Sequence, residues 1–185
     1  MTERRLGKRE RILDAARGLF LRNGLRGTSM EAIAREAGIA KPTLYAHFAD
    51  KDAVFTAILE VLIADKMAAF EEALAGEGEV AERIGAALAR KYQVLAAVLE
   101  ASPHADELFS EHRRAARLFE QSDAAVLGRV TAELSAAGVE DAENLARLLV
   151  DASFGVAQKA IGRTTLDHDI KLLAERLIRP EIEGR

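Results

Sequence analysis

The chain has 185 residues, of which 49% are hydrophobic and 30% are charged, a balance that predicts a folded globular protein rather than a disordered one. The absence of cysteine excludes disulfides and thiolate zinc sites. No apolar run approaches the roughly 20 residues of a membrane span. The charged first residues do not resemble a secretory signal, so we expect a cytoplasmic protein.

Charge is distributed unevenly along the chain. The net charge is −4, but residues 1–51 hold 11 Lys/Arg against 6 Asp/Glu, while the remainder holds 15 against 24. A basic head on an acidic body favours a polyanionic partner for the head. Charge alone leaves a solvated, charged face as an equally good explanation.

Three short helices are predicted in the head. One apolar stripe indicates a first helix over about residues 8–22, and Gly24 ends it. Thr28 and Glu31 form a possible capping box for a second helix, which Ser29 could cap instead, and Gly38 ends that helix. The stripe of the first helix consists of Ile12, Leu13, Ala16, Leu19 and Phe20.

A third helix is predicted over about residues 40–47, with Ala40, Leu44 and Phe48 on its buried face and Pro42 in its first turn. Asp50 is typical of the N-cap of a long fourth helix. The fourth helix is predicted over about residues 51–74. Further helices are predicted over about residues 80–101, 105–137 (one or two helices), 141–161 and 167–178, the last stopped by Pro180. With no convincing strand, the prediction is an all-α fold of about nine helices.

Residues 28–51 carry the most specific pattern. A small residue at Ala34 and a glycine at Gly38 suit two helices joined by a tight turn, as in a helix-turn-helix. The second helix of such a pair enters the major groove. Base contacts are predicted for Pro42 and Thr43, a guanine edge or a phosphate for Lys41, and phosphate contacts for Tyr45, His47 and Lys51.

The segment resembles the DNA-binding head of the tetracycline-repressor (TetR) family. The matching residues are Gly24, Thr28, Ser29, Ile33, Ala34, Ala37, Gly38, Ile39, Leu44, Tyr45, His47, Phe48 and Lys51, with Ile12, Leu13, Ala15, Ala16, Leu19 and Phe20 upstream. One position departs from the family pattern, since Ala40 stands where a capping Ser or Thr is usual.

The resemblance implies a DNA-binding domain over residues 1–51 and an effector-binding, dimerising domain over residues 52–185. It implies a homodimeric repressor released from a palindromic operator by a small ligand. It also adds Ser29 to the DNA contacts, and the tail residues Arg4, Arg5 and Lys8 as further ones.

Two apolar stripes in the last helices suit a four-helix dimer interface, and packing within one subunit is the alternative. The stripes comprise Leu145, Leu148, Leu149, Ala152 and Val156, then Leu166, Ile170, Leu173 and Leu177. A ligand pocket in the body is predicted from Tyr92, Leu95, Leu99, Phe109, Phe119, Phe154 and Gln158. These residues favour a hydrophobic or aromatic effector, and we expect no bound cofactor.

Other functions are less well supported. His104, Asp106, Glu107, Glu111 and His112 could hold a metal, but solvated charges near Pro103 explain them equally well. No Glu lies three residues before a His, and no phosphate-binding glycine loop or HExxH occurs, so we expect no catalysis. A pure interaction protein would explain the acidic helical body but not the basic head.

Overall fold

The computed structural model describes residues 7–100, 102–104, 107–108, 116–159 and 165–183. Helices are the only regular structure in these residues, which confirms the predicted all-α fold. The chain forms two compact units, one of residues 1–61 with 101–116 and one of residues 62–100 with 117–185. None of the helices described is long and apolar enough to span a membrane. The predicted boundary after residue 51 stays a prediction.

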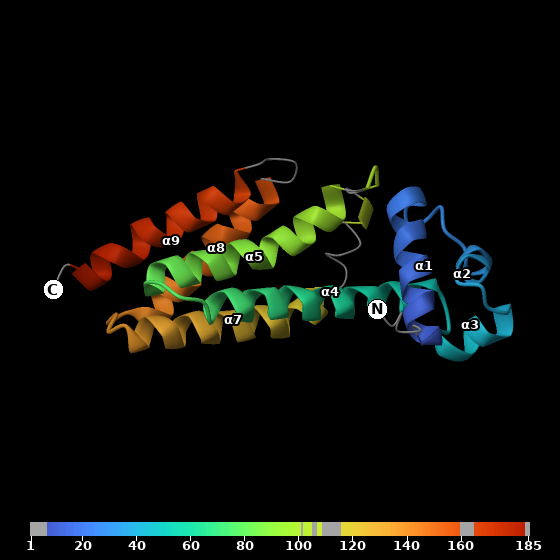
Figure 1. The fold of residues 1–185 in the computed structure, drawn as a ribbon, viewed down its shortest axis with the longest axis horizontal. Coiled ribbons are helices and arrows are strands. Elements are labelled where there is room, and N and C mark those ends of the chain that lie inside the picture. Colours follow the sequence, from blue (N-terminus) through green and yellow to red (C-terminus); the bar gives the residue numbers. More distant parts are fainter. Residues whose placement is uncertain (1–6, 101, 105–106, 109–115, 160–164, 184–185) are drawn as a thin grey trace, which may run out of the picture. The chain divides into compact units, whose positions relative to one another are not determined.

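The first unit contains three short helices and the start of a long one (Figure 1). They are α1 (Lys8–Asn23), α2 (Met30–Glu36), α3 (Lys41–His47) and the first part of α4 (Lys51–Leu74). Ile12, Ile33, Leu44 and Val54 have no exposed surface and lie at the centre of this unit. All five residues of the predicted α1 stripe are buried, so the helical periodicity correctly identified the inward face.

Two glycines in turns and one N-capping aspartate determine where these helices begin and end. Gly24 has a φ of 73° and its N–H bonds the Phe20 carbonyl at 2.9 Å, and Gly38 has a φ of 63°. Glycine adopts these positive φ values without the cost that a Cβ imposes. Asp50 caps α4 as predicted, because its carboxylate accepts a hydrogen bond from the Ala53 N–H at 2.8 Å.

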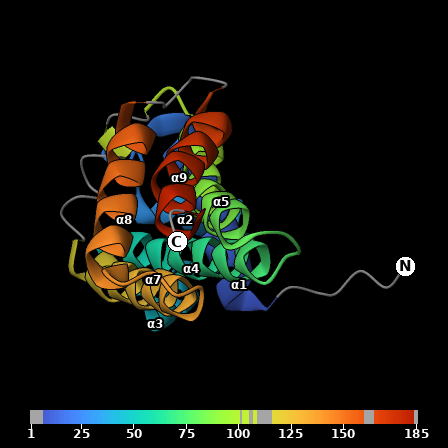
Figure 2. The ribbon, with the colours of Figure 1, turned by 90° about the vertical axis from the view of Figure 1, so that its left-hand side faces the viewer.

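The second unit consists of the rest of α4 with four further helices. These are α5 (Val80–Glu100), α7 (Ala116–Ala136), α8 (Ala142–Lys159) and α9 (Leu166–Glu183). In both views α9 lies along α5 (Figures 1 and 2). A Cβ at Gly85 of α5 would stand 3.1 Å from the Ala174 side chain and 3.2 Å from the Lys171 backbone. The missing side chain at Gly85 therefore allows the close approach of the two helices.

The last helix differs from its prediction. Pro180 was expected to stop it, but α9 continues to Glu183 with the proline inside its final turn. A proline there removes the backbone hydrogen bond to the carbonyl four residues before it and disfavours the helix. Ile178 before it is fully buried and Ile182 beyond it packs against the core, so apolar contacts on both sides stabilise the extra turn.

Candidate nucleic-acid interface

The α3 helix turns one side to the core and leaves the other open. Leu44 is fully buried and Phe48, just beyond the helix, is buried too. The opposite side carries the predicted DNA contacts, of which Lys41, Pro42, Tyr45 and His47 are exposed and Thr43 is half-buried. This arrangement satisfies the condition that a recognition helix must meet, and the contacts themselves stay predictions.

The first turn of α3 lacks a side-chain cap. Ala40 is the N-cap residue, with the extended backbone typical of that position (φ −68°, ψ 143°), but its methyl group accepts no hydrogen bond. The Thr43 and Leu44 N–H groups bond the Ala40 carbonyl at 2.9 and 3.2 Å. Pro42 has no N–H to satisfy. The backbone alone therefore begins this helix.

Lys41 forms an ion pair across the two helices of the motif. Its ammonium lies 2.5 Å from the Glu31 carboxylate of α2 and 5.9 Å from the centre of the Tyr45 ring. A hydrogen bond to Lys41 lowers the pKa of Glu31, and Glu31 in turn raises the pKa of Lys41. Both side chains are exposed, so solvent screens the pair and a phosphate can compete for the lysine.

Ser29, and not Thr28, caps α2. The Ser29 hydroxyl accepts a hydrogen bond from the Ala32 N–H at 3.2 Å, which leaves its own proton free to be donated. Thr28 is buried and donates to the Gly24 carbonyl at 2.8 Å. Its role is therefore to close the turn between α1 and α2, while Ser29 remains exposed at the helix end, where phosphates bind.

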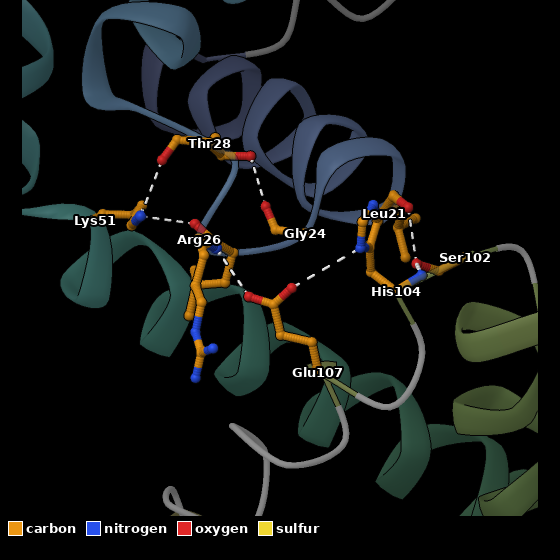
Figure 3. A network of polar contacts seen from close by, with 9 residues as sticks. Leu21, Gly24, Arg26, Thr28, Lys51, Ser102, His104 and Glu107 are labelled. Carbon is orange, nitrogen blue, oxygen red and sulfur yellow. Dashed lines mark hydrogen bonds and ion pairs between the residues drawn. The ribbon is translucent and has the colours of Figure 1, made fainter.

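Lys51 joins the start of α4 to this turn (Figure 3). Its ammonium donates to the carbonyls of Leu25 at 2.6 Å and Thr28 at 2.9 Å. The spacing of the sequence could not show this, because the acceptors are backbone atoms more than 20 residues away. An ammonium has three donors, so one remains for the predicted phosphate contact.

The segment after α5 also contacts the head (Figure 3). The Ser102 hydroxyl donates to the Leu21 carbonyl at 2.7 Å, and the Arg26 N–H donates to the Glu107 carboxylate at 2.9 Å. A Cβ at Gly24 would collide with that carboxylate. Sequence reasoning missed these contacts, since no local pattern marks a partner about 80 residues away.

Only two members of the possible metal cluster lie in the described residues. His104 Nδ1 is 3.9 Å from a Glu107 oxygen, and Glu107 already accepts the Arg26 N–H. Asp106, Glu111 and His112 lie outside the described residues. Among those that are described, no group of three or more possible ligands comes together.

The predicted pocket residues are spread between core and surface. Tyr92 and Phe119 are buried and Leu95 is half-buried, whereas Phe154 and Gln158 are exposed. The rings of Tyr92 and Phe154 have centroids 6.4 Å apart. Phe109 and the side chain of Leu99 lie outside the description. Pocket lining by these residues stays a prediction.

The predicted dimer residues are also divided between buried and exposed positions. Leu149, Leu166 and Ile170 belong to the core of the second unit, where they pack within one subunit. Leu145, Ala152, Val156, Leu173 and Leu177 are half-buried. Leu148 is 50% exposed, and Leu172, which the prediction did not include, is 40% exposed. An interface built on these helices stays a prediction, with Leu148 as its most accessible apolar residue.

Comparison with known proteins finds a family match in the N-terminal part of the chain. Residues 12–58 match the family described as bacterial regulatory proteins of the tetR family. The chain is 41% identical over 68 residues to the HTH-type transcriptional regulator UidR of Escherichia coli K12, covering 37% of this chain and 35% of UidR. It is 31% identical over 94 residues to the HTH-type transcriptional repressor KstR2 of Rhodococcus jostii, covering 51% and 46%. These alignments thus span about a third to a half of each relative.

Solved structures show the same fold over nearly the whole chain. The TetR-family regulator SCO4454 of Streptomyces coelicolor superposes with a TM-score of 0.70 at 21% identity, over 95% of this chain and 96% of its own. The fatty acid degradation regulator FadR of Bacillus halodurans gives 0.66 at 19% identity, over 98% of each chain. The similar proteins named here are described as regulators.

Proposed function

We propose that this chain, whose residues 12–58 belong to the tetR family of bacterial regulatory proteins, is a sequence-specific DNA-binding transcriptional regulator. One observation carries the proposal. The α3 helix buries Leu44 and holds Lys41, Pro42 and Tyr45 on its exposed side. A helix presented in this way, preceded by a helix that Ser29 caps, suits insertion into a major groove.

Within this proposal, the side chains divide by what they can contact. Lys41 and Thr43 carry groups that suit base edges, and the Pro42 ring can pack against a thymine methyl group. Tyr45, His47 and Ser29 offer donors to phosphate oxygens, which position the protein without reading sequence. The excess of basic residues in the head, 11 Lys/Arg against 6 Asp/Glu over residues 1–51, favours approach to a polyanion.

The regulator acts as a homodimer that represses from a palindromic operator and is released by a small ligand. Two heads can then read half-sites about 34–36 Å apart. Ligand binding in the second unit favours a form in which the heads no longer match successive grooves. The contacts of Ser102 and Glu107 with the head support this mechanism, because they attach the segment that follows α5 to α1 and to the α1–α2 turn.

Fluorescence anisotropy with DNA from upstream of the chain's own gene tests DNA binding. We expect a near-palindromic fragment to bind much more tightly than a scrambled fragment, with affinity falling steeply as salt rises. Equal, weak binding to both fragments would contradict the proposal and would favour a protein that acts only through other proteins.

Selection from a randomised operator tests which residue reads the bases. Thr43→Ala should change the preference at one base pair in each half-site, by roughly 1–3 kcal/mol. Thr131→Ala in α7 is the matched control, since it removes the same hydroxyl outside the head. An unchanged preference in Thr43→Ala would remove Thr43 from base recognition.

A further inference from the structure

The second unit contains two buried lysines on neighbouring helices. Lys66 of α4 is 5% exposed and Lys91 of α5 is 1% exposed. Lys66 takes the place of an apolar residue, since Leu62 before it and Phe70 after it are both buried at four-residue spacing. Lysine is almost never buried to this extent unless it is paired, so the two positions need an explanation.

Among the described residues, only one carboxylate lies at ion-pair distance from either ammonium group. Lys91 Nζ donates to the Asp123 carboxylate of α7 at 2.7 Å. In the part of the chain that the structure describes, Lys66 has no carboxylate at ion-pair distance, and its Nζ lies 5.1 Å from the centre of the Phe119 ring. Lys91 Nζ likewise lies 5.0 Å from the centre of the Tyr92 ring. The buried lysine cluster, by which we mean Lys66, Lys91, Tyr92, Phe119 and Asp123, thus has one positive charge in excess.

Burial shifts the pKa values of Lys66 and Tyr92 in opposite directions, and in each case toward the neutral form. Burial, and then the charge of Lys91, lower the pKa of Lys66 to about 8, while Asp123 acts to raise it. Lys66 is therefore still mainly protonated at pH 7. Burial, with Asp123 and Asp151, raises the pKa of Tyr92, so its phenol stays a neutral hydrogen-bond donor. The cluster combines an unpaired cation with a neutral donor.

Packing alone does not account for a lysine at position 66. A methionine would fill the same space without the free energy of desolvating a charge. The charge is therefore the feature that needs a partner. A second polar group without a partner lies on α8, where the Ser153 hydroxyl is buried and makes no hydrogen bond within the residues described.

We propose that the buried lysine cluster binds the carboxylate of an amphipathic organic acid, with Lys66 and Lys91 facing the anion and the rings of Tyr92 and Phe119 packing against its apolar part. This inference rests on the proposed function and names the chemical class of its effector. A monoanion matches the single excess charge, whereas a phosphate dianion would exceed it. The Tyr92 phenol can donate to the carboxylate, and the aromatic rings provide apolar contact area.

Thermal unfolding of the full chain with defined probes tests the proposal without DNA. The probes are straight-chain monocarboxylates of four to twelve carbons and 4-phenylbutyrate, each compared with its primary amide. At pH 7 we expect at least one acid to raise the Tm by several degrees, while its amide raises it much less. Lys66→Met should reduce the affinity for that acid at least tenfold. Lys171→Met, which removes an exposed lysine of α9, should leave the affinity unchanged.

Proton uptake gives a second readout on the unaltered protein. A bound carboxylate stabilises the charged form of Lys66, so binding at pH 8.5 should take up a proton from the buffer. Titration calorimetry in two buffers of different ionisation enthalpy measures this uptake, and Lys66→Gln should abolish it. Affinity should fall as the pH rises through about 8, where free Lys66 loses its proton.

The outcomes separate this inference from the proposed function. Equal stabilisation by acids and amides, or no stabilisation by any acid, would overturn the anionic site even if the protein binds its operator. An acid that binds with Lys66 dependence while no operator is found would uphold the site and contradict the regulator. An acid that binds and lowers operator affinity would support both.

Discussion

Lys41 is a residue for which two anions compete. In the absence of DNA its ammonium is held by Glu31, and a phosphate or a guanine edge would have to displace that carboxylate. Because both side chains are exposed, the ion pair is weak enough to exchange. Under the proposed function, Glu31 would therefore compete with DNA for Lys41.

Glu31→Gln should strengthen DNA binding. The substitution frees Lys41 and removes one negative charge from the side that faces the phosphates, so affinity should rise several-fold for operator and random DNA alike. Fluorescence anisotropy at two salt concentrations measures the change. Glu72→Gln, the same change at an exposed position of α4, serves as control. Unchanged affinity in Glu31→Gln would place this ion pair away from the duplex.

Lys66→Met should stabilise the protein in a pH-dependent way. In the folded state the pKa of Lys66 is lowered to about 8 from 10.5, so below pH 8 the native state contains a costly buried charge. Between pH 8 and 10.5 the native state loses its proton before the unfolded state does, and the wild type gains stability. The variant should therefore be more stable by up to roughly 3 kcal/mol below pH 8 and nearly equal near pH 10.5.

Chemical unfolding across this pH range measures the Lys66→Met difference. Lys171→Met is the control, because its lysine is exposed beside Asp167 and should change stability little at any pH. A Lys66→Met difference that does not depend on pH would show that packing, and not charge, determines the effect.

At the scale of single elements, capping residues decide where the helices of the motif begin. Ser29 and Asp50 supply side-chain oxygens to the first turns of α2 and α4, while Ala40 supplies none to α3. Of these three helices, α3 is thus the least well stabilised at its N-terminus. Its backbone already has the geometry of an N-cap, so only the side chain is missing.

Ala40→Ser should stabilise α3. A serine hydroxyl at this position can accept a hydrogen bond from the first turn, which adds on the order of 1 kcal/mol to the free energy of unfolding. Denaturant titration measures the gain. Ala46→Ser, at an exposed position inside the same helix, should give no gain, because serine does not favour helix interiors. Equal effects of the two substitutions would show that no cap forms.

Helix boundaries followed from the sequence wherever a local signal determines them. The predicted range of α4, residues 51–74, agrees with the structure because Asp50 and the glycines near residue 76 mark its ends. The end of α9 did not follow, because the local signal of Pro180 was outweighed by the contact of Ile182 with the core. Local rules fail where packing beyond the element stabilises a conformation that they disfavour.

At the scale of the whole molecule, α8 and α9 each expose a large leucine that the proposed dimer would cover. Leu148 and Leu172 are half or nearly half exposed, although the same helices bury Leu149 and Ile170 in the core. Large exposed leucines on two adjacent helices are typical of a surface that another subunit covers. A repressor that reads a palindrome needs such pairing.

Leu148→Glu should weaken the proposed dimer. A charge buried in the interface without a partner costs several kcal/mol, so sedimentation velocity should show monomers at micromolar concentration. Operator affinity should fall with the dimer. Ala124→Glu, which adds the same charge at an exposed position of α7, should leave the mass unchanged. If Leu148→Glu sediments as the wild type does, this face of α8 is not the interface.

The sequence by itself determined the helical class, the inward stripe of α1 and the outward face of α3, because these depend on periodicity, caps and glycines within a few residues of one another. The tertiary structure alone decided the partners of Lys51 and Glu107 and the surroundings of Lys66. Each depends on atoms of distant segments, and two of these side chains bond backbone groups, which no residue pattern displays. A polar residue on an apolar stripe, such as Lys66, was a visible signal, but only packing showed that its charge is buried and has no carboxylate partner in the part of the chain described.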